Sequence, residues 1–242
     1  MTLHVSPERL PVLMVTGLAK EMRLAEGPGL VAIASGGDTG RLRRDLSERH
    51  VPGCRAVLSF GIAGGLDPSL SAGDVVVATG IIAGGHRWPT HPALADQFAA
   101  TLLAGGIRSK RADIAGVDAP LLTADDKAAT RLATGAAAVD MESHVACEFA
   151  ARHGLVCAAL CIICDPAARS MPAMVANALR PDGEVDPFAV LADLVRKPQQ
   201  LISLPRLATE ARTSFRALGR CRDLLGIGRG FPDLVELLGD VA

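Results

Sequence analysis

The sequence predicts a single α/β domain in which helices cover both faces of a central sheet. Short runs of apolar, often β-branched residues alternate with helix-like stretches along most of the chain, and this alternation is typical of three-layer α/β/α domains. The chain has 242 residues, of which 49% are hydrophobic, and no shift in composition divides it. Because this length and composition suffice for one large core, we expect one domain over residues 1–242.

The predicted strands are short and are bounded by glycine or polar residues. They cover Val12–Val15, Leu30–Ala34, Ala56–Phe60, Asp74–Ala78, Ala112–Val117, Ala137–Met141 and Leu155–Ile163. Helix-like stretches cover Thr39–His50, Ala93–Leu103, Asp125–Ala133 and Ser143–His153. Ligands bind at the carboxyl ends of strands in such sheets, so the residues directly after each strand are candidates for a site.

A helical C-terminal extension is predicted over about residues 186–242, where strand signals stop. Proline in a first turn and a following glycine predict a helix from about Ser203 to Leu225 that ends at Gly226. One face of this helix is apolar, and arginines recur at four-residue spacing beside it. Two interpretations stay open: a terminal helix packed on the core, or an apolar surface that contacts lipid.

Composition argues against several classes of protein. The net charge is -1, and aromatic residues make up 3% of the chain with no tyrosine and one tryptophan, so neither a basic field nor stacking platforms favour nucleic acid. The longest apolar run, Gly154–Cys164, is far shorter than the roughly 18 residues of a membrane span. The N-terminal residues do not resemble a secretory leader. We therefore expect a cytoplasmic protein whose six cysteines are reduced thiols.

Cys157, Cys161 and Cys164 have a spacing found in iron–sulfur sites. They fall in a predicted strand, where side chains alternate between faces, so Cys164 points away from the other two. Small buried packing residues are therefore the preferred interpretation. The Gly/Pro-rich stretch from His86 to His91 lacks a further metal ligand. We expect neither a metal nor an organic cofactor, and no GxGxxG or GxxxxGK[ST] motif indicates a nucleotide fold.

Three ordered segments carry the strongest functional signal. Residues 59–70 read SFGIAGGLDPSL and are followed by GDVVV at 73–77. Residues 138–143 read AVDMES, and residues 161–165 read CIICD. Together they resemble the motifs of the nucleoside phosphorylase and nucleosidase family, over about residues 10–170.

The resemblance implies a phosphorylase-type fold with a mixed central sheet, cleavage of a purine N-glycosidic bond and assembly into a homo-oligomer. The chain is most similar to the hopanoid-associated phosphorylases, because it continues with DGEVD at 182–186 and a tail containing KPQQL. That group removes adenine from adenosylhopane. The resemblance thus implies a lipid-linked nucleoside substrate, and it leaves peripheral contact with the inner membrane face open.

Asp165 is the candidate general acid. Breaking a ribose–purine bond creates an oxocarbenium-like sugar and a poor anionic leaving group, so the base must be protonated as it departs. Asp165 ends the most apolar strand, where desolvation favours the protonated carboxyl. The alternative is an Asp that caps a following helix near Pro166.

Glu142 and the Met141 backbone are the candidates for holding ribose. A carboxylate at a strand-to-helix junction can accept both ribose hydroxyl protons and stabilise positive charge on the sugar, and the resemblance assigns Glu142 the same task. An ordinary first-turn glutamate, favoured by the helix dipole, is the alternative. Asp140 replaces the Glu that is more usual in the family.

Glu21 is the candidate base that activates water. It matches the N-terminal Glu of the nucleosidases if one residue is deleted between Gly17 and Glu21. Without that deletion, Met22 occupies the position of the nucleosidase Glu, and Glu21 is a surface residue. Ile62 stands where many family members carry Ser or Thr, and its side chain cannot bind an oxyanion. This favours water over phosphate as the nucleophile, although arginines near Arg41 could cradle phosphate.

The predicted catalytic residues are thus Asp165 and Glu21. The predicted substrate-binding residues are Gly17, Ile62, Ala63, Gly64, Gly65, Met141, Glu142 and Cys164, and the stretch from His86 to His91 is a candidate for the 5′ side of the pocket. Two alternatives remain: a methylthioadenosine or adenosylhomocysteine nucleosidase, and a non-catalytic nucleoside-binding module. A binding module would not need both Asp165 and Glu142.

Overall fold

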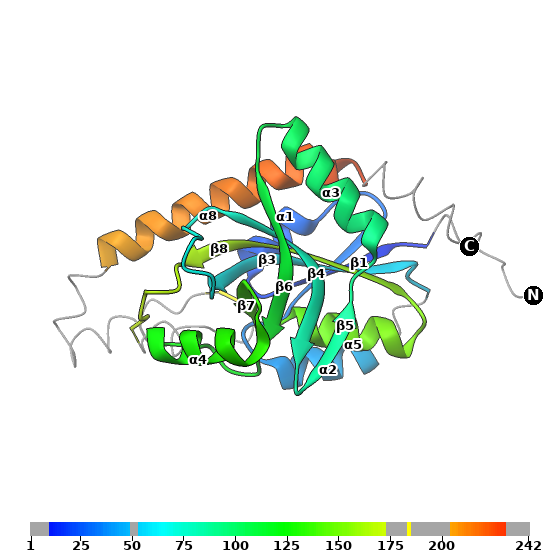
Figure 1. Cartoon of the computed structure of the whole chain (residues 1–242). Coiled ribbons are helices and arrows are strands. Elements are labelled where there is room, and N and C mark those ends of the chain that lie inside the picture. Colours follow the sequence, from blue (N-terminus) through cyan, green and yellow to red (C-terminus); the bar gives the residue numbers. More distant parts are fainter. Residues whose placement is uncertain (1–9, 49–52, 173–182, 185–203, 231–242) are drawn as a thin grey trace, which may run out of the picture.

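The strands form one mixed sheet in the computed structural model, which describes residues 10–48, 53–172, 183–184 and 204–230 (Figure 1). The strands are β1 (Val12–Thr16), β2 (Leu30–Ala34), β3 (Ala56–Gly65), β4 (Val75–Ala83), β5 (His86–Pro89), β6 (Ser109–Gly116), β7 (Ala138–Asp140) and β8 (Val156–Asp165). The helices are α1 (Ala19–Ala25), α2 (Thr39–Glu48), α3 (Pro92–Ala104), α4 (Ala124–Thr134), α5 (Ser143–Arg152) and α8 (Leu204–Leu224), followed by the 3-10 turn η3 (Ile227–Arg229).

The sheet partly closes on itself. Its order is β2-β1-β3-β7-β6-β4-β5, and β8 pairs with both β3 and β4. β3, β8, β4, β6 and β7 therefore pair in a closed circuit, with β8 parallel to β3 and antiparallel to β4. The predicted α/β class with a mixed central sheet is confirmed. The sequence did not predict that the sheet partly closes.

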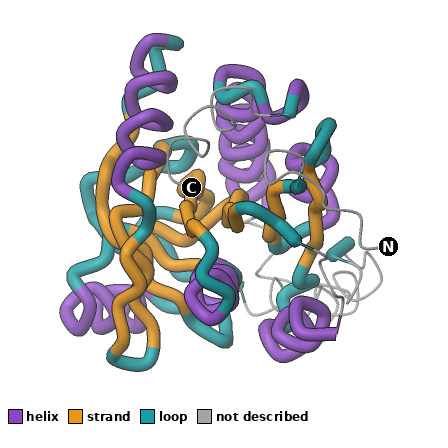
Figure 2. Tube along the Cα trace, turned by 90° about the vertical axis from the view of Figure 1, so that its right-hand side faces the viewer, coloured by secondary structure: helices purple, strands orange, loops and turns teal. Residues whose placement is uncertain are grey.

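Helices cover the strands on two sides. α3 and α8 lie on one side of the sheet and α2, α4 and α5 on the other (Figure 1), and Figure 2 shows helices around a core of strands. β8 separates two apolar clusters: Cys161 and Ile163 pack in the cluster with α2 and α5, whereas Leu160 and Ile162 pack in the cluster with α1, α3 and α8. Burial on both faces explains the unbroken apolar run of β8.

β3 is longer than the sequence indicates. Gly61–Gly65 were expected in a loop after the strand, but they lie inside it. The strand continues because β8 pairs beside it as far as Gly64, with a register shift after Ala63, and β7 pairs with Gly64 and Gly65. The sequence pattern also missed the short helix α1 and the strand β5, which pairs antiparallel with the end of β4.

α8 packs on the core. Leu218 and Cys221 are fully buried, and the Ser214 hydroxyl donates to the Ile163 carbonyl of β8 at 2.8 Å. The packed-helix interpretation therefore holds for its C-terminal half, while Leu204 and Leu207 are only partly covered. The rest of the predicted extension, residues 186–203 and 231–242, lies outside the described residues.

Two cysteines correct the expectation of reduced thiols. Cys147 of α5 and Cys157 of β8 form a disulfide, with their Cα atoms 5.5 Å apart. α5 packs directly on β8, so the two buried side chains meet at a separation suited to a disulfide. Cys161 and Cys164 are free thiols.

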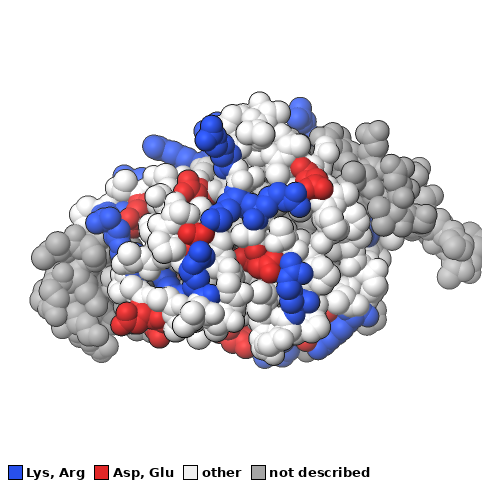
Figure 3. Space-filling view, viewed as in Figure 1, with Lys and Arg blue, Asp and Glu red and all other residues white. Residues whose placement is uncertain are grey.

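The surface shows no large field of one sign on the face in Figure 3, where basic and acidic side chains alternate between uncharged ones. Ion pairs are also present at the surface; Arg87, for example, bonds Asp113 through two nitrogens, at 2.7 and 2.8 Å. Within the described residues, no helix combines the length and the apolar character needed to cross a membrane.

Candidate active site

Glu21 occupies a buried position at the start of α1, directly after β1. The backbone N–H groups of Gly17 and Leu18 donate to its Oε2 at 2.8 and 2.9 Å, and that of Ile62 in β3 donates to Oε1 at 2.9 Å. The residue is 1% exposed. Burial raises the pKa of Glu21 to about 7, while the three N–H donors oppose the rise.

Two glycines make room for this carboxyl group. A Cβ at Gly61 would lie 2.9 Å from the Oε2 atom of Glu21, closer than real Cβ contacts come. A Cβ at Gly17 would lie 3.1 Å from Glu142 Oε1 and 3.3 Å from Glu21 Oε2. Gly17 therefore lies between two carboxyl groups that come from different elements.

Glu142 lies at the junction between β7 and α5, where the sequence predicted it. The Ser35 hydroxyl, at the end of β2, donates to its Oε1 at 2.5 Å, and the Met141 N–H donates to its Oε2 at 3.3 Å. Burial raises the pKa of Glu142 to about 8, with a further contribution from the nearby Asp140 carboxyl. Asp140 is itself held by Ser143, whose N–H donates to Oδ1 at 3.1 Å.

Asp165 ends β8, and its side chain is 14% exposed. Both carboxylate oxygens would lie 3.5 Å from a Cβ at Gly64, so the side chain approaches β3 three residues beyond the contact of Glu21 with Gly61. Three residues of a strand span about 10 Å. Burial raises the pKa of Asp165, and an ion pair with Lys127 of α4 offsets part of that rise.

The remaining predicted residues lie along the same strands. Ile62 packs against the cluster that contains α1 and α8, and Ala63 and Gly65 are buried in β3. Cys164 precedes Asp165 in β8, and burial raises the pKa of its thiol to about 12, so the thiol stays neutral at physiological pH.

The stretch from His86 to His91 is held at its His91 end far from Asp165, and its role at the 5′ side of the pocket stays a prediction. The His91 N–H donates to the carbonyl of Cys157 at 2.8 Å, near the beginning of β8. Asp165 lies at the other end, eight residues along the strand, a distance of about 26 Å. The segment formed β5 because its backbone extends the antiparallel pairing of β4.

Two arginines of α2 have partners within the chain. Arg43 pairs with Asp118 at 2.9 Å, and Arg41 donates to the Ala34 carbonyl at 2.9 Å. Among the residues that the structure describes, no group of three or more His, Cys, Asp or Glu side chains could hold a metal ion.

The sequence pattern of the phosphorylase superfamily matches residues 26–185. This range covers more than half of the chain and includes β3, the β7–α5 junction and the end of β8. The chain belongs to the phosphorylase superfamily. The prediction of an enzyme of the nucleosidase and nucleoside phosphorylase kind is confirmed at this level. No curated protein matches the chain.

Solved structures of nucleosidases share the fold of this superfamily member. Futalosine hydrolase of Helicobacter pylori is 17% identical with a TM-score of 0.63, over 90% of this chain and 99% of that one. The 5′-methylthioadenosine/S-adenosyl homocysteine nucleosidase of Campylobacter jejuni is 16% identical with a TM-score of 0.57, over 88% and 99%. A mutant of the Helicobacter pylori nucleosidase with 5′-methylthioadenosine in its active site is 16% identical with a TM-score of 0.62, over 88% and 98%.

Sequence reasoning missed two contacts in this phosphorylase-superfamily site. Ser35 had a usable signal, because it directly follows a strand and precedes two glycines. Lys127 had none: a lysine after two aspartates in a first helical turn is typical of an exposed residue. It is buried because α4 packs its first turn against the backbone that follows β8.

Proposed function

We propose that this phosphorylase-superfamily enzyme hydrolyses the bond between adenine and ribose in a 5′-substituted adenosine. The observation that carries the proposal is the placement of three carboxyl groups next to Gly17 and the glycines of β3. The carboxyl group of Glu21 in α1 is buried, and those of Glu142 at the β7–α5 junction and Asp165 at the end of β8 are partly buried. Burial raises the pKa of all three. Perturbed carboxyl groups gathered in this way are typical of catalytic sites.

The three groups suit three tasks in N-glycoside cleavage. Asp165, whose raised pKa favours the protonated carboxyl, donates a proton to the departing purine. Glu142 accepts the ribose hydroxyls and stabilises positive charge on the sugar. Glu21, with a pKa of about 7, accepts a proton from the attacking water when it is ionised.

The surroundings of Glu21 favour water over phosphate. Converging backbone N–H groups at a helix start attract anions, and here the donors from Gly17, Leu18 and Ile62 already bind the Glu21 carboxylate. A phosphate would have to displace that carboxylate or be repelled by it. The Ile62 side chain adds no donor, and Arg43 is bound to Asp118.

For the 5′ substituent we propose a hopanoid, so that the substrate is adenosylhopane. The sequence resemblance supports it, as does the position of α8. Lys20, the neighbour of Glu21, lies 4.1 Å from the Phe215 ring of α8, and Arg169, just beyond Asp165, pairs with Glu210 of α8 at 2.9 Å. The partly covered Leu204 and Leu207 continue this helix beyond Glu210 and offer apolar contact to a lipid.

Methylthioadenosine or adenosylhomocysteine is the second candidate substrate, favoured by the fold shared with nucleosidases that act on them. A non-catalytic binding module is disfavoured, because ligand binding alone does not require three carboxyl groups whose pKa values are raised. Assembly into a homo-oligomer, a cytoplasmic location and contact with the inner membrane face stay predictions. Light scattering and flotation with anionic vesicles test the assembly and the membrane contact.

The experiment is a substrate panel with and without phosphate. Adenosylhopane, methylthioadenosine and adenosine are each incubated with the enzyme, and adenine and the sugar product are measured by mass spectrometry. We expect adenine and free ribosyl product at a rate that phosphate does not change, fastest for adenosylhopane. Asp165→Asn is the control and should lower turnover at least about a hundredfold. Formation of a ribose 1-phosphate would refute hydrolysis.

A further inference from the structure

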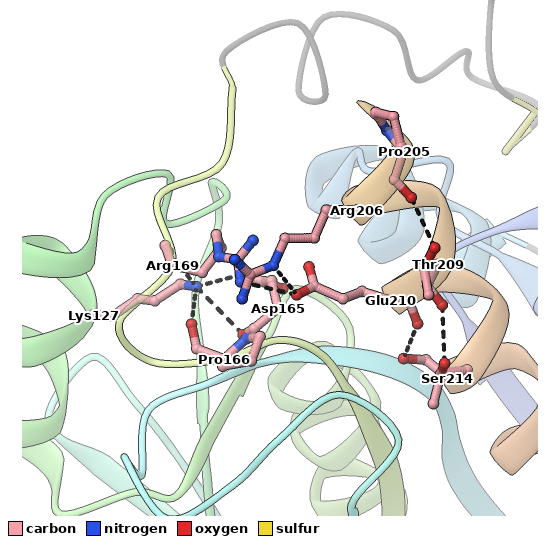
Figure 4. Close-up of polar contacts among 10 residues, drawn as sticks. Lys127, Asp165, Pro166, Arg169, Pro205, Arg206, Thr209, Glu210 and Ser214 are labelled. Carbon is pink, nitrogen blue, oxygen red and sulfur yellow. Dashed lines mark hydrogen bonds and ion pairs between the residues drawn. The ribbon is translucent and has the colours of Figure 1, made fainter. Parts of the chain in front are cut away.

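Lys127 is a buried cation that faces the end of β8. Its side chain is 1% exposed, and its ammonium forms an ion pair with Asp165 Oδ2. It also donates to the carbonyl oxygens of Arg169 at 2.9 Å and Pro166 at 3.1 Å, and it lies 3.4 Å from the carbonyl of Asp165 itself (Figure 4). The contacts come from α4, far from β8 in the sequence.

An ammonium group has three N–H donors. Asp165 Oδ2 and the carbonyls of Pro166 and Arg169 account for all three. Lys127 therefore has no donor left for a substrate atom, and its effect on a reaction must pass through Asp165 and the backbone after it. Lys127 bonds only one of the two carboxylate oxygens of Asp165, so the other, Oδ1, is free of the lysine.

The titratable groups around Asp165 come from three elements. Lys127 approaches from α4, Cys164 precedes Asp165 in β8, and Glu210 approaches from α8. The positive charge of Arg169 is directed to Glu210, which also pairs with Arg206 at 3.2 Å (Figure 4). Burial and Glu210 raise the pKa of Asp165, and Lys127 lowers it. Lys127 thus opposes the burial of the carboxyl group.

We propose that Lys127 is a positioning residue for the general acid: it fixes Oδ2 and the backbone from Asp165 to Arg169, leaves Oδ1 to the purine, and stabilises the carboxylate that remains after proton transfer. This inference rests on the proposed hydrolysis.

The step balances without a co-reactant. The proton on Asp165 Oδ1 moves to a ring nitrogen of the purine, while the electron pair of the breaking C1′–N bond stays on the base. Water forms the new C1′–O bond, and its proton goes to Glu21. Asp165 is then an anion beside the Lys127 ammonium, and exchange with solvent returns the proton from Glu21 to Asp165. An acid whose conjugate base is stabilised in this way is a stronger proton donor.

The test is Lys127→Met, which keeps most of the side-chain length and removes the charge. Without the cation the Asp165 carboxylate is less stable, so the pKa of Asp165 rises and the alkaline limb of the kcat profile moves up by at least about one pH unit. Turnover at the plateau falls about tenfold to a hundredfold. Lys110→Met, which removes an ion pair with Asp67 elsewhere in the chain, should leave the profile in place.

Lys127→Gln is the second variant, in case Lys127→Met does not fold. It keeps amide donors for the two carbonyls but lacks the charge, so it should show the same displaced limb. In an Asp165→Asn background neither substitution should lower turnover further, because the charge of the lysine and its backbone contacts act on the reaction only by placing and stabilising that carboxyl group. A normal alkaline limb in Lys127→Gln, or losses that multiply with those of Asp165→Asn, would overturn the proposal.

A stability cycle separates this proposal from the proposed function. Wild type, Lys127→Gln, Asp165→Asn and the double variant are unfolded in urea at several pH values. We expect an interaction between the two sites that grows as pH rises through the pKa of Asp165, since only the carboxylate attracts the ammonium. If wild type released adenine from no nucleoside, the hydrolysis would fail. If the interaction were absent at every pH, the role of Lys127 would fail.

Discussion

Glu21 and Glu142 are glutamates that the fold buries although burial favours their neutral form. Folding raises the pKa of Glu142 from 4.5 to about 8 and that of Glu21 to about 7. The native state therefore holds more protons than the unfolded state between about pH 4.5 and 8, and the free energy of unfolding contributed by these groups falls as pH rises through that window. The site thus destabilises the fold at the pH where Glu21 is ionised.

Glu142→Gln should be more stable and less active. The neutral amide removes the penalty of ionising a buried carboxyl group, so we expect the free energy of unfolding to rise by at least about 1 kcal/mol above pH 8 and to change little near pH 4.5. Ribose contacts are lost, so kcat and substrate affinity should both fall about tenfold or more. Urea unfolding and steady-state kinetics measure both effects.

Glu148→Gln is the matched control on the same helix, because Glu148 forms surface ion pairs with Arg43 and Arg152. It should leave turnover normal and show no gain in stability at alkaline pH. A stability gain in Glu142→Gln without any kinetic loss would mean that Glu142 does not hold ribose.

The candidate site residues that the sequence predicts best are carboxyl side chains that follow a predicted strand. Glu142 and Asp165 stand at the predicted ends of β7 and β8. Lys127 could not be predicted, because its burial depends on a contact between α4 and the backbone after β8. The disulfide was equally inaccessible, because the packing of α5 on β8 brings Cys147 and Cys157 together and neither sequence neighbourhood indicates it.

At the scale of the element, the glycines of β3 have two structural roles. Its glycines continue the pairing with β8 and β7 and also leave space for carboxyl groups from α1 and β8. Sequence periodicity ended the strand at Phe60, because glycines favour turns when no partner strand is considered. In the fold, pairing with β8 and β7, which are distant in sequence, extends the strand to Gly65.

Gly61→Ala should displace Glu21 from its three backbone donors. The added Cβ would lie 2.9 Å from Oε2 and 3.0 Å from the carboxyl carbon, so the side chain must shift. If Glu21 activates water, we expect kcat to fall at least about tenfold, whereas nucleoside binding falls less because Glu142 still contacts ribose. Unchanged kcat in a Gly61→Ala variant that is shown to be folded would remove Glu21 from the mechanism.

Gly219→Ala in α8 is the control for that substitution. Apart from its chain neighbours and the adjacent backbone of the helix, no described atom lies within 4 Å of its added Cβ, and alanine is favoured over glycine in a helix interior by about 0.5–1 kcal/mol. It should therefore raise the free energy of unfolding slightly and leave the cleavage of adenosine unchanged.

At the scale of the whole molecule, α8 joins the core to the site. Its C-terminal half completes the apolar cluster with α1 and α3 through Leu218 and Cys221, and its N-terminal half reaches Arg169, just beyond Asp165. Removing the whole helix would expose the cluster and unfold the domain. A deletion therefore cannot separate recognition of a lipid from stability, and single substitutions on the two halves are needed.

Leu207→Gln tests the lipid proposal on the N-terminal half of α8. Leu207 lies one turn before Glu210 on the same side of the helix and is partly exposed. Burial of apolar groups contributes about 0.8 kcal/mol per CH₂, so loss of contact with a hopane skeleton should raise the KM for adenosylhopane about tenfold and leave adenosine cleavage normal.

Leu132→Gln, at an 89% exposed leucine of α4, is the control and should leave the cleavage of both substrates unchanged. Leu218→Ala should instead lower stability by about 2–5 kcal/mol and affect both substrates equally at a given folded fraction. Equal KM values for adenosylhopane in Leu207→Gln and Leu132→Gln would show that this half of α8 does not contact the lipid.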